Sequence, residues 1–305
     1  ALNIFCLAIG ICFCMLIGEY VLHERSVNSG MAGIDRQCLV GSRWKIKDTG
    51  PEITTVGPLP KALKEQYPGL VENYYRFNPV TNVVSAGDRH FREDMAIGDT
   101  TLVSMYGFPL LYGDPHHAFV NNRSAVITEE LALKLFGDRN ALNKVITISN
   151  STPGATDYKV SAVLKALPYN SISNFLGNSD YSVFIPFEGN QYYSGGTGED
   201  LWSEFFTVGL VELKAGVQPS RLAAPVRQLL DLNAPETVSK NLEVTFSPLN
   251  TYQLDKDGGA VRKTLNILSL VSLGILLMAI INFVNIMMGT SSYRIKEIGL
   301  ESVRR

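Results

Sequence analysis

The sequence is poor in charge and contains no motif for nucleotide hydrolysis. Of its 305 residues 18% are charged, below the roughly one quarter found in soluble domains, and the formal net charge is -2. This near-neutral balance argues against a nucleic-acid-binding protein, which would carry a basic face or tail. No Walker A sequence occurs, so any use of ATP must depend on another chain.

Cysteine is scarce as well. The chain has four cysteines, and three of them (Cys6, Cys12 and Cys14) lie inside the first apolar run, where a thiol behaves as a small hydrophobic group. Cys38 lies apart from them and has no partner in the polar part of the chain. Neither a disulfide framework nor a zinc site can be built from this set, so the cysteines are interpreted as structural.

Histidine offers little more. The pair His116-His117, after Asp114, resembles a metal corner, but adjacent residues in an extended segment point to opposite sides, and no third or fourth ligand can be nominated. No Gly-x-Ser-x-Gly elbow frames a serine. We therefore predict no catalytic residue, no metal and no cofactor, and the chain is not expected to be an enzyme.

Both ends of the chain are long hydrophobic runs. Residues 1–22 begin with eighteen residues without charge, which nearly meets the length of about 20 residues needed to cross a bilayer as a helix. A cleavable signal peptide is the alternative, but the basic start and the cleavage site that it requires are missing. We predict a first transmembrane helix at residues 1–22.

The second run, residues 264–290, carries no charge and predicts a second transmembrane helix. Asn282 and Asn285 lie near its C-terminal end. One interpretation is hydrogen bonding between packed helices, because an amide in hydrocarbon requires a partner. The other is a substrate path, since polar groups inside a membrane can mark one.

Flanking charges predict the orientation. Arg294, Lys296, Arg304 and Arg305 follow the second helix, which places residues 291–305 in the cytoplasm. Two helices then place the intervening residues 23–260 outside the cytoplasm.

The central region alternates between strand and helix patterns, which predicts an α+β domain. Thr128 is a suitable N-cap for a helix over residues 129–136, and Gly137 is a suitable stop. Asn78-Pro79 is a turn signal between two strands, a lobe boundary is expected near residues 176–200, and residues 195–198 are expected to form a flexible loop. Further helices are predicted at residues 61–67 and 221–232, and strands at 43–47, 70–77, 80–85, 90–97, 144–149, 158–167, 205–213 and 242–246.

Several stretches resemble the ABC transporter permease family that contains MacB, FtsX and the lipoprotein-release subunits. Residues 106–114, 125–129 and 134–137 are similar to the "phenylalanine, apolar, Gly-Asp … Ile-Thr-Glu … Leu-Phe-Gly" signature of the MacB-like periplasmic core. Residues 280–285 resemble the family's second helix. The stretch after it resembles a cytoplasmic Arg-x-Lys-Glu-Ile-Gly motif, which includes Arg294, Lys296, Glu297, Ile298, Gly299 and Leu300.

This resemblance implies a permease subunit of an ABC-type efflux or release system, of the variety common in Bacteroidetes-like bacteria, in the bacterial inner membrane with its large domain in the periplasm. It implies a separate ABC ATPase that binds near residues 294–300, a homodimer or pseudo-dimer, and a periplasmic adaptor. The surroundings would be membrane lipid, and no nucleic acid would be bound. Members have at least four transmembrane helices, so the chain is expected to be a fragment of a longer protein.

Two rival classes remain open. A two-helix membrane sensor with a periplasmic ligand-binding domain would require a signalling segment after residue 305. A membrane-tethered enzyme would require a site that the sequence does not display.

Overall fold

The computed structural model describes residues 2–46, 50–149, 154–166, 172–174, 180–189 and 198–303, without the side chains of residues 2–4, 6, 174 and 289–303. The chain divides into two compact units. The helical unit comprises Ala1–Ser26 and Gln253–Arg305, and the domain unit comprises Val27–Tyr252.

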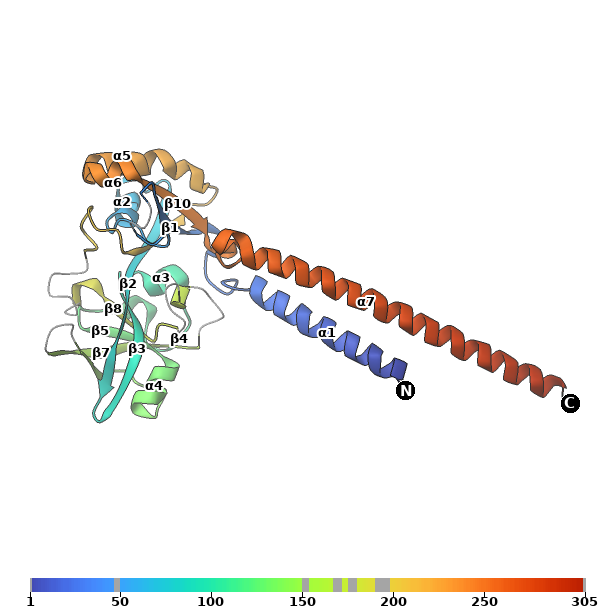
Figure 1. Cartoon of the computed structure of the whole chain (residues 1–305). Coiled ribbons are helices and arrows are strands. Elements are labelled where there is room, and N and C mark those ends of the chain that lie inside the picture. The colour runs from blue at the N-terminus through green and yellow to red at the C-terminus, as the bar shows by residue number, and fades with distance from the viewer. Residues whose placement is uncertain are drawn as a thin grey trace. The chain divides into compact units, whose positions relative to one another are not determined.

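The domain unit is built on strands that form one connected sheet (Figure 1). The strand order is β10-β1-β9-β2-β3-β8-β5-β7-β4, and β6 pairs with both β2 and β7. The β3–β8 and β5–β7 pairs are parallel, and the other pairs are antiparallel. The strands are β1 (Gln37–Trp44), β2 (Val71–Ala86), β3 (Arg89–Gly98), β4 (Leu110–Tyr112), β5 (Ser124–Thr128), β6 (Val145–Ser149), β7 (Ala155–Leu164), β8 (Val183–Pro186), β9 (Val208–Leu213) and β10 (Leu242–Pro248).

The helices of the domain unit are short. They are α2 (Leu59–Gln66), α3 (Leu102–Tyr106), α4 (Glu129–Phe136), α5 (Ala223–Asn233) and α6 (Glu236–Asn241). Short 3-10 turns lie at Ile34–Arg36, Pro115–His117, Ile172–Asn174, Phe187–Gly189 and Pro219–Leu222. The helical unit contains α1 (Leu2–Arg25) and most of α7 (Leu249–Val303).

The pairing of β6 closes part of the sheet into a barrel. Strands β2, β3, β8, β5, β7 and β6 each pair with the next, and β6 returns to β2 through Val84 and Ser85. Side chains such as Val84, Ile127 and Val160 form one apolar core there, together with Leu131 of α4. At the other end β10, β1, β9 and the start of β2 share a second core with α2 and α5, and a third core around Tyr75 and Tyr106 lies in the middle.

Strand β2 passes through Asn78-Pro79 without turning, so the predicted turn there is wrong. Pro79 is paired in register with Ala96 of β3. On the edge of β2 that faces away from β3, the pairing with β9 ends at Phe77 and the pairing with β6 begins at Val84. Among the described strands, none pairs with Pro79 on that edge. Proline is tolerated at such an edge because no partner there requires an amide hydrogen.

Helix α4 is confirmed at the predicted residues. The Thr128 hydroxyl accepts a hydrogen bond from the Leu131 amide, and Gly137 adopts the left-handed conformation (φ 68°) that ends the helix. The expected helix at residues 61–67 is present as α2. The predicted helix at residues 221–232 instead begins as a 3-10 turn at Pro219–Leu222 before α5, because Pro225 restricts its first turn.

Several strands begin at other residues than the sequence predicts. The strand predicted at 43–47 lies earlier, at β1, because Gln37–Ser42 is buried on both faces and shows no alternation. β7 begins before Tyr158, and β9 begins after Phe205. The short elements α3, α6, β4, β5 and β8 were not predicted. The expected loop at residues 195–198 lies outside the described residues except for Gly198, and the lobe boundary near 176–200 stays a prediction.

A glycine at the end of β3 tests this packing. A Cβ atom at Gly98 would lie 2.6 Å from the Arg76 carbonyl oxygen and 2.8 Å from both the Phe77 Cβ and the Tyr75 hydroxyl. We expect Gly98→Ala to lower the free energy of unfolding by about 1–3 kcal/mol through overpacking. Both tryptophans, Trp44 and Trp202, lie in the domain unit, so thermal unfolding of the purified chain followed by tryptophan fluorescence measures the change.

The control is Gly69→Ala, because no heavy atom lies within 4 Å of a Cβ atom there. This variant should be neutral or stabilised by up to about 1 kcal/mol. Equal stability of the two variants would show that the close approach of β3 to β2 is not as described.

Candidate functional site

The residues of the predicted coupling segment lie near the end of α7. The backbone of α7 is helical through Val303, so it includes Arg294, Lys296, Glu297, Ile298, Gly299 and Leu300. Their side chains lie outside what the structure describes. Their role in binding an ATPase therefore stays a prediction.

Asn282 and Asn285 lie one helical turn apart on α7 and share a face of the helix. Asn282 is half-buried and Asn285 is exposed. Among the described side chains neither amide has a recorded hydrogen bond, so their predicted role in helix packing also stays a prediction.

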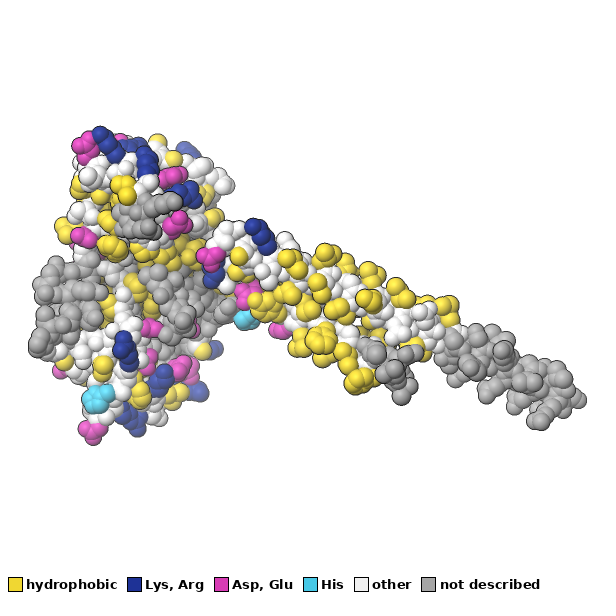
Figure 2. Space-filling model, viewed as in Figure 1, with side chains coloured by type: hydrophobic (Ala, Val, Ile, Leu, Met, Phe, Trp, Pro, Cys, Tyr) yellow, Lys and Arg dark blue, Asp and Glu magenta, His cyan; other side chains and the backbone are white. Residues whose placement is uncertain are grey.

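Two helices are long and apolar enough to cross a membrane. The candidate spans are Leu7–Arg25 and Leu249–Met288, with mean hydropathies of 1.6 and 2.6. Only 6% of each 18-residue window is buried, and Figure 2 shows hydrophobic side chains exposed along both helices. Such exposed apolar surface is stable in lipid but not in water.

Within the helical unit α1 packs against α7. A Cβ atom at Gly10 would lie 3.6 Å from the Ala279 Cβ, which is an ordinary van der Waals distance, so the two helices are neighbours at this point. The Cys14 thiol donates to the Ser272 carbonyl oxygen (3.3 Å), and the Gln253 amide donates to Glu24 (3.1 Å). Because residues early in α1 contact residues late in α7, the two helices run antiparallel.

The most extensively bonded charged group in the described domain is Arg76, on β2. Its guanidinium binds Asp99 through two parallel hydrogen bonds of 2.9 Å, and the Arg76 amide donates to the same carboxylate (2.9 Å). Nη1 donates to the carbonyl oxygens of Gly57 (3.2 Å) and Glu199 (2.7 Å). The guanidinium also lies 5.5 Å from the ring centre of Phe187. Arg76 thus ties β2, the end of β3 and three loops together.

This ion pair is buried, since 4% of the Arg76 side chain and 11% of the Asp99 side chain are exposed. Burial raises the pKa of the Asp99 carboxyl above its ordinary value, although the hydrogen bonds and charge of Arg76 oppose the rise. Arg76 was not predicted from the sequence, because an arginine within a strand pattern is usually solvent-exposed. The only local signal is the Gly98-Asp99 pair, which directly follows the strand predicted at residues 90–97.

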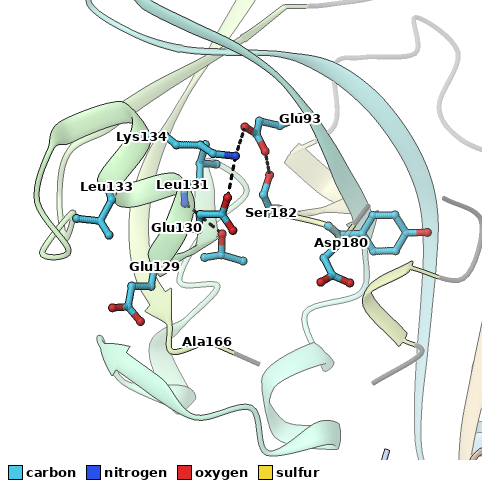
Figure 3. Close-up of a pocket in the computed structure, with 11 residues that line it drawn as sticks. Glu93, Glu129, Glu130, Leu131, Leu133, Lys134, Ala166, Asp180 and Ser182 are labelled. Atoms are coloured by element: carbon cyan, nitrogen blue, oxygen red, sulfur yellow. Dashed lines mark hydrogen bonds and ion pairs between the residues drawn. The ribbon is translucent and has the colours of Figure 1, made fainter. Parts of the chain in front are cut away.

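A cavity of about 580 Å³ lies beside the N-terminus of α4. Figure 3 shows Lys134 between Glu93 and Glu130, with Ser182 donating to Glu93. The Lys134 ammonium lies 3.4 Å from Glu93 and 3.0 Å from Glu130. Four carboxylates and one ammonium line the cavity, so it disfavours anionic ligands.

The hydrogen bond from Lys134 to Glu130, with the charges of Glu93 and Glu130, raises the pKa of the Lys134 ammonium above its ordinary value. Lys134 therefore stays protonated at neutral pH and is neither a nucleophile nor a general base. In the part of the chain that the structure describes, no group of three or more His, Cys, Asp and Glu residues could hold a metal.

The histidine pair and Cys38 lie in unrelated environments. His117 is exposed and binds Asp114 through Nδ1 (2.8 Å), and His116 donates its backbone amide to the same side chain. Cys38 is buried in the core that contains α2 and α5, and burial raises the pKa of its thiol to about 12. Such a thiol is unreactive at neutral pH.

Comparison with known proteins identifies the domain. The family described as the MacB-like periplasmic core domain matches residues 1–229. The chain belongs to this family. A search of curated proteins found no match.

Solved structures share the fold of the MacB-like core. A domain of a putative permease from Porphyromonas gingivalis has a TM-score of 0.54 and 19% sequence identity, and the match covers 72% of this chain and 92% of that one. The periplasmic region of MacB from Actinobacillus actinomycetemcomitans has a TM-score of 0.50 and 13% identity, with the same two coverages. The chain is therefore a membrane protein of the ABC transporter permease class, with a MacB-like extracytoplasmic domain flanked by apolar helices. The family is a component of transporter permeases.

The ion pair of the MacB-like core gives a sharp test. Asp99→Asn should leave the buried Arg76 charge without its buried counterion and lower the free energy of unfolding by about 3–5 kcal/mol. The measurement is thermal unfolding of the purified chain, followed by tryptophan fluorescence.

Asp200→Asn is the matched control. The Asp200 carboxylate lies 3.4 Å from the same guanidinium, but 73% of its side chain is exposed. Exposed pairs contribute about 0–1 kcal/mol, so this variant should unfold close to the wild type. If the two variants were equally stable, Arg76 would not depend on Asp99.

Proposed function

We propose that the chain is a permease subunit of an ABC-type efflux or release system in a bacterial inner membrane. A separate ABC ATPase binds the segment around Arg294, Lys296 and Glu297 on the cytoplasmic side. Its ATP-driven motion passes along α7 to the periplasmic domain. The active assembly contains two permease units, as a homodimer or pseudo-dimer, and a periplasmic adaptor is an expected partner.

The observation that carries this proposal is that one helix, α7, contains three kinds of segment. Its first turn belongs to the domain core, where Leu249 is fully buried and its carbonyl oxygen accepts a hydrogen bond from Asn28 (2.8 Å). An apolar span follows, and then the Arg-x-Lys-Glu-Ile-Gly motif. A displacement at the motif therefore acts on a segment that is covalently continuous with the domain core.

The charge distribution along α7 supports the orientation. Arg294 and Lys296 follow the apolar span, as positive residues do on the cytoplasmic side of a membrane. On the other flank lie Arg262 and Lys263, so the bias rests on the larger number of positive residues after the span, which include Arg304 and Arg305.

The coupling segment is tested by reversing its charges. In Lys296→Glu/Glu297→Lys the local charges exchange places while the net charge is unchanged. We expect at least a tenfold loss of the ATPase stimulation that the wild-type chain gives to its partner in lipid nanodiscs, because the complementary charges of the ATPase then meet like charges. The readout is phosphate release at saturating ATP.

Glu236→Lys/Lys240→Glu is the control, because it exchanges an exposed ion pair on α6 of the domain. It should keep full stimulation. Equal activity of the two variants would exclude residues 294–300 as the coupling segment, and a wild-type chain that neither binds nor stimulates an ABC ATPase would contradict the proposed function.

A further inference from the structure

Helix α7 is interrupted near its beginning. Lys256 has an extended backbone (φ -57°, ψ 155°), and the next three residues, Asp257, Gly258 and Gly259, have positive φ angles of 53°, 66° and 75°. Helical geometry holds on both sides of this segment. Asp257 is the informative residue, because a positive φ is uncommon outside glycine, and aspartate is among the few residue types that tolerate it.

An ion pair spans the interruption. Nε and Nη2 of Arg262 both donate to one Asp255 oxygen, at 2.9 and 2.6 Å. In a continuous helix these residues would be about 10.5 Å apart along the axis. Helical side chains also lean toward the N-terminus, so Asp255 would point away from Arg262. The pair therefore forms only while α7 is interrupted.

Contacts with α1 lie on both sides of the interruption. Gln253 binds Glu24 before it, while Ser272 and Ala279 contact α1 at Cys14 and Gly10 after it. Helix α1 itself is uninterrupted. Four residues rewound into a helix occupy about 6 Å and turn through about 400°. Rewinding would therefore move one of these two sets of contacts out of register.

The two glycines are not required by packing. No heavy atom lies within 4 Å of a Cβ atom at Gly258 or at Gly259. Glycine adopts a positive φ without strain and is also a poor helix former. The two glycines therefore act here through their backbone conformations and not through side-chain packing. The chain after Gly259 is helical again, whereas Lys256 and Asp257 before the glycines are part of the interruption.

We propose that residues 255–262 of α7 are a two-state switch, in which an unwound segment held by the Asp255–Arg262 ion pair interconverts with a continuous helix. The ion pair is the latch of the unwound state. Gly258 and Gly259 keep the two states close in free energy. The switch belongs to the chain itself, and only its use during transport rests on the proposed function.

Hydrogen exchange of the complete chain in lipid nanodiscs tests the switch without an ATPase, so its failure would leave the proposed function untouched. The readout is amide protection in peptides that cover residues 254–263, measured by mass spectrometry. Gly258→Ala/Gly259→Ala should raise this protection on the order of tenfold or more, because alanine penalises the unwound state and favours the helix. Gly216→Ala, at another open glycine with positive φ (78°), should leave the segment unchanged.

The latch gives the decisive comparison. If the Asp255–Arg262 ion pair stabilises the unwound state, Asp255→Asn should shift the segment toward the helix and raise its amide protection roughly two- to fivefold, as expected for the loss of an exposed ion pair. If the unwound segment is a fixed turn, the same variant should lower the amide protection or leave it unchanged. That result would overturn the proposal. Asp231→Asn removes an i,i+4 pair with Arg227 inside regular helix α5, and there protection should fall.

Discussion

Strand β2 contributes side chains to all three apolar cores of the domain. Val71 packs with α2 and α5, Tyr75 and Phe77 lie in the middle core, and Val84 lies in the barrel. A strand can do this only if it is long and unbroken, because its side chains keep their alternating directions through each core. The buried pair of Arg76 and Asp99 lies at the middle of this strand, where loops from both ends of the domain meet. A buried ion pair is weak evidence for stability, but it specifies one geometry, since any other leaves a charge without a partner.

Local signals explain which elements could be predicted from sequence. Helix α4 was predicted at the correct residues because Thr128 and Gly137 act within one turn of its ends. The turn predicted at Asn78-Pro79 was wrong because the turn preference of these residues is a local property, whereas the pairing of Pro79 with Ala96 depends on β3. Strands such as β5 and β8 are short and buried, so they lack the alternation that marks a half-buried strand. The barrel closure through Val84 and Ile148 joins strands far apart in the chain, and no local pattern reports it.

The candidate sites divide in the same way. The apolar spans could be predicted because a membrane selects for composition, which a single sequence displays. Arg76 could not, because its importance comes from two carbonyl groups and a carboxylate contributed by distant segments. The residues proposed for coupling near Arg294 were predicted only from family resemblance, because the proposed ATPase partner would complete their chemistry. A site shared between two chains leaves only half of its pattern in either one.

The proposed function, in which the chain transmits motion, would require stiffness along most of the path and compliance at few points. The domain would supply stiffness, because six of its strands pair into a closed ring and the Arg76 network fixes the segments around it. Helix α7 supplies stiffness along its apolar span, where every backbone group must be bonded internally. The interruption at Lys256–Gly259 lies before that span, among exposed polar residues such as Asp255 and Asp257. Water can satisfy the backbone groups freed by unwinding only outside the hydrocarbon, so this is where a helix crossing a membrane can change its length or rotation at low cost.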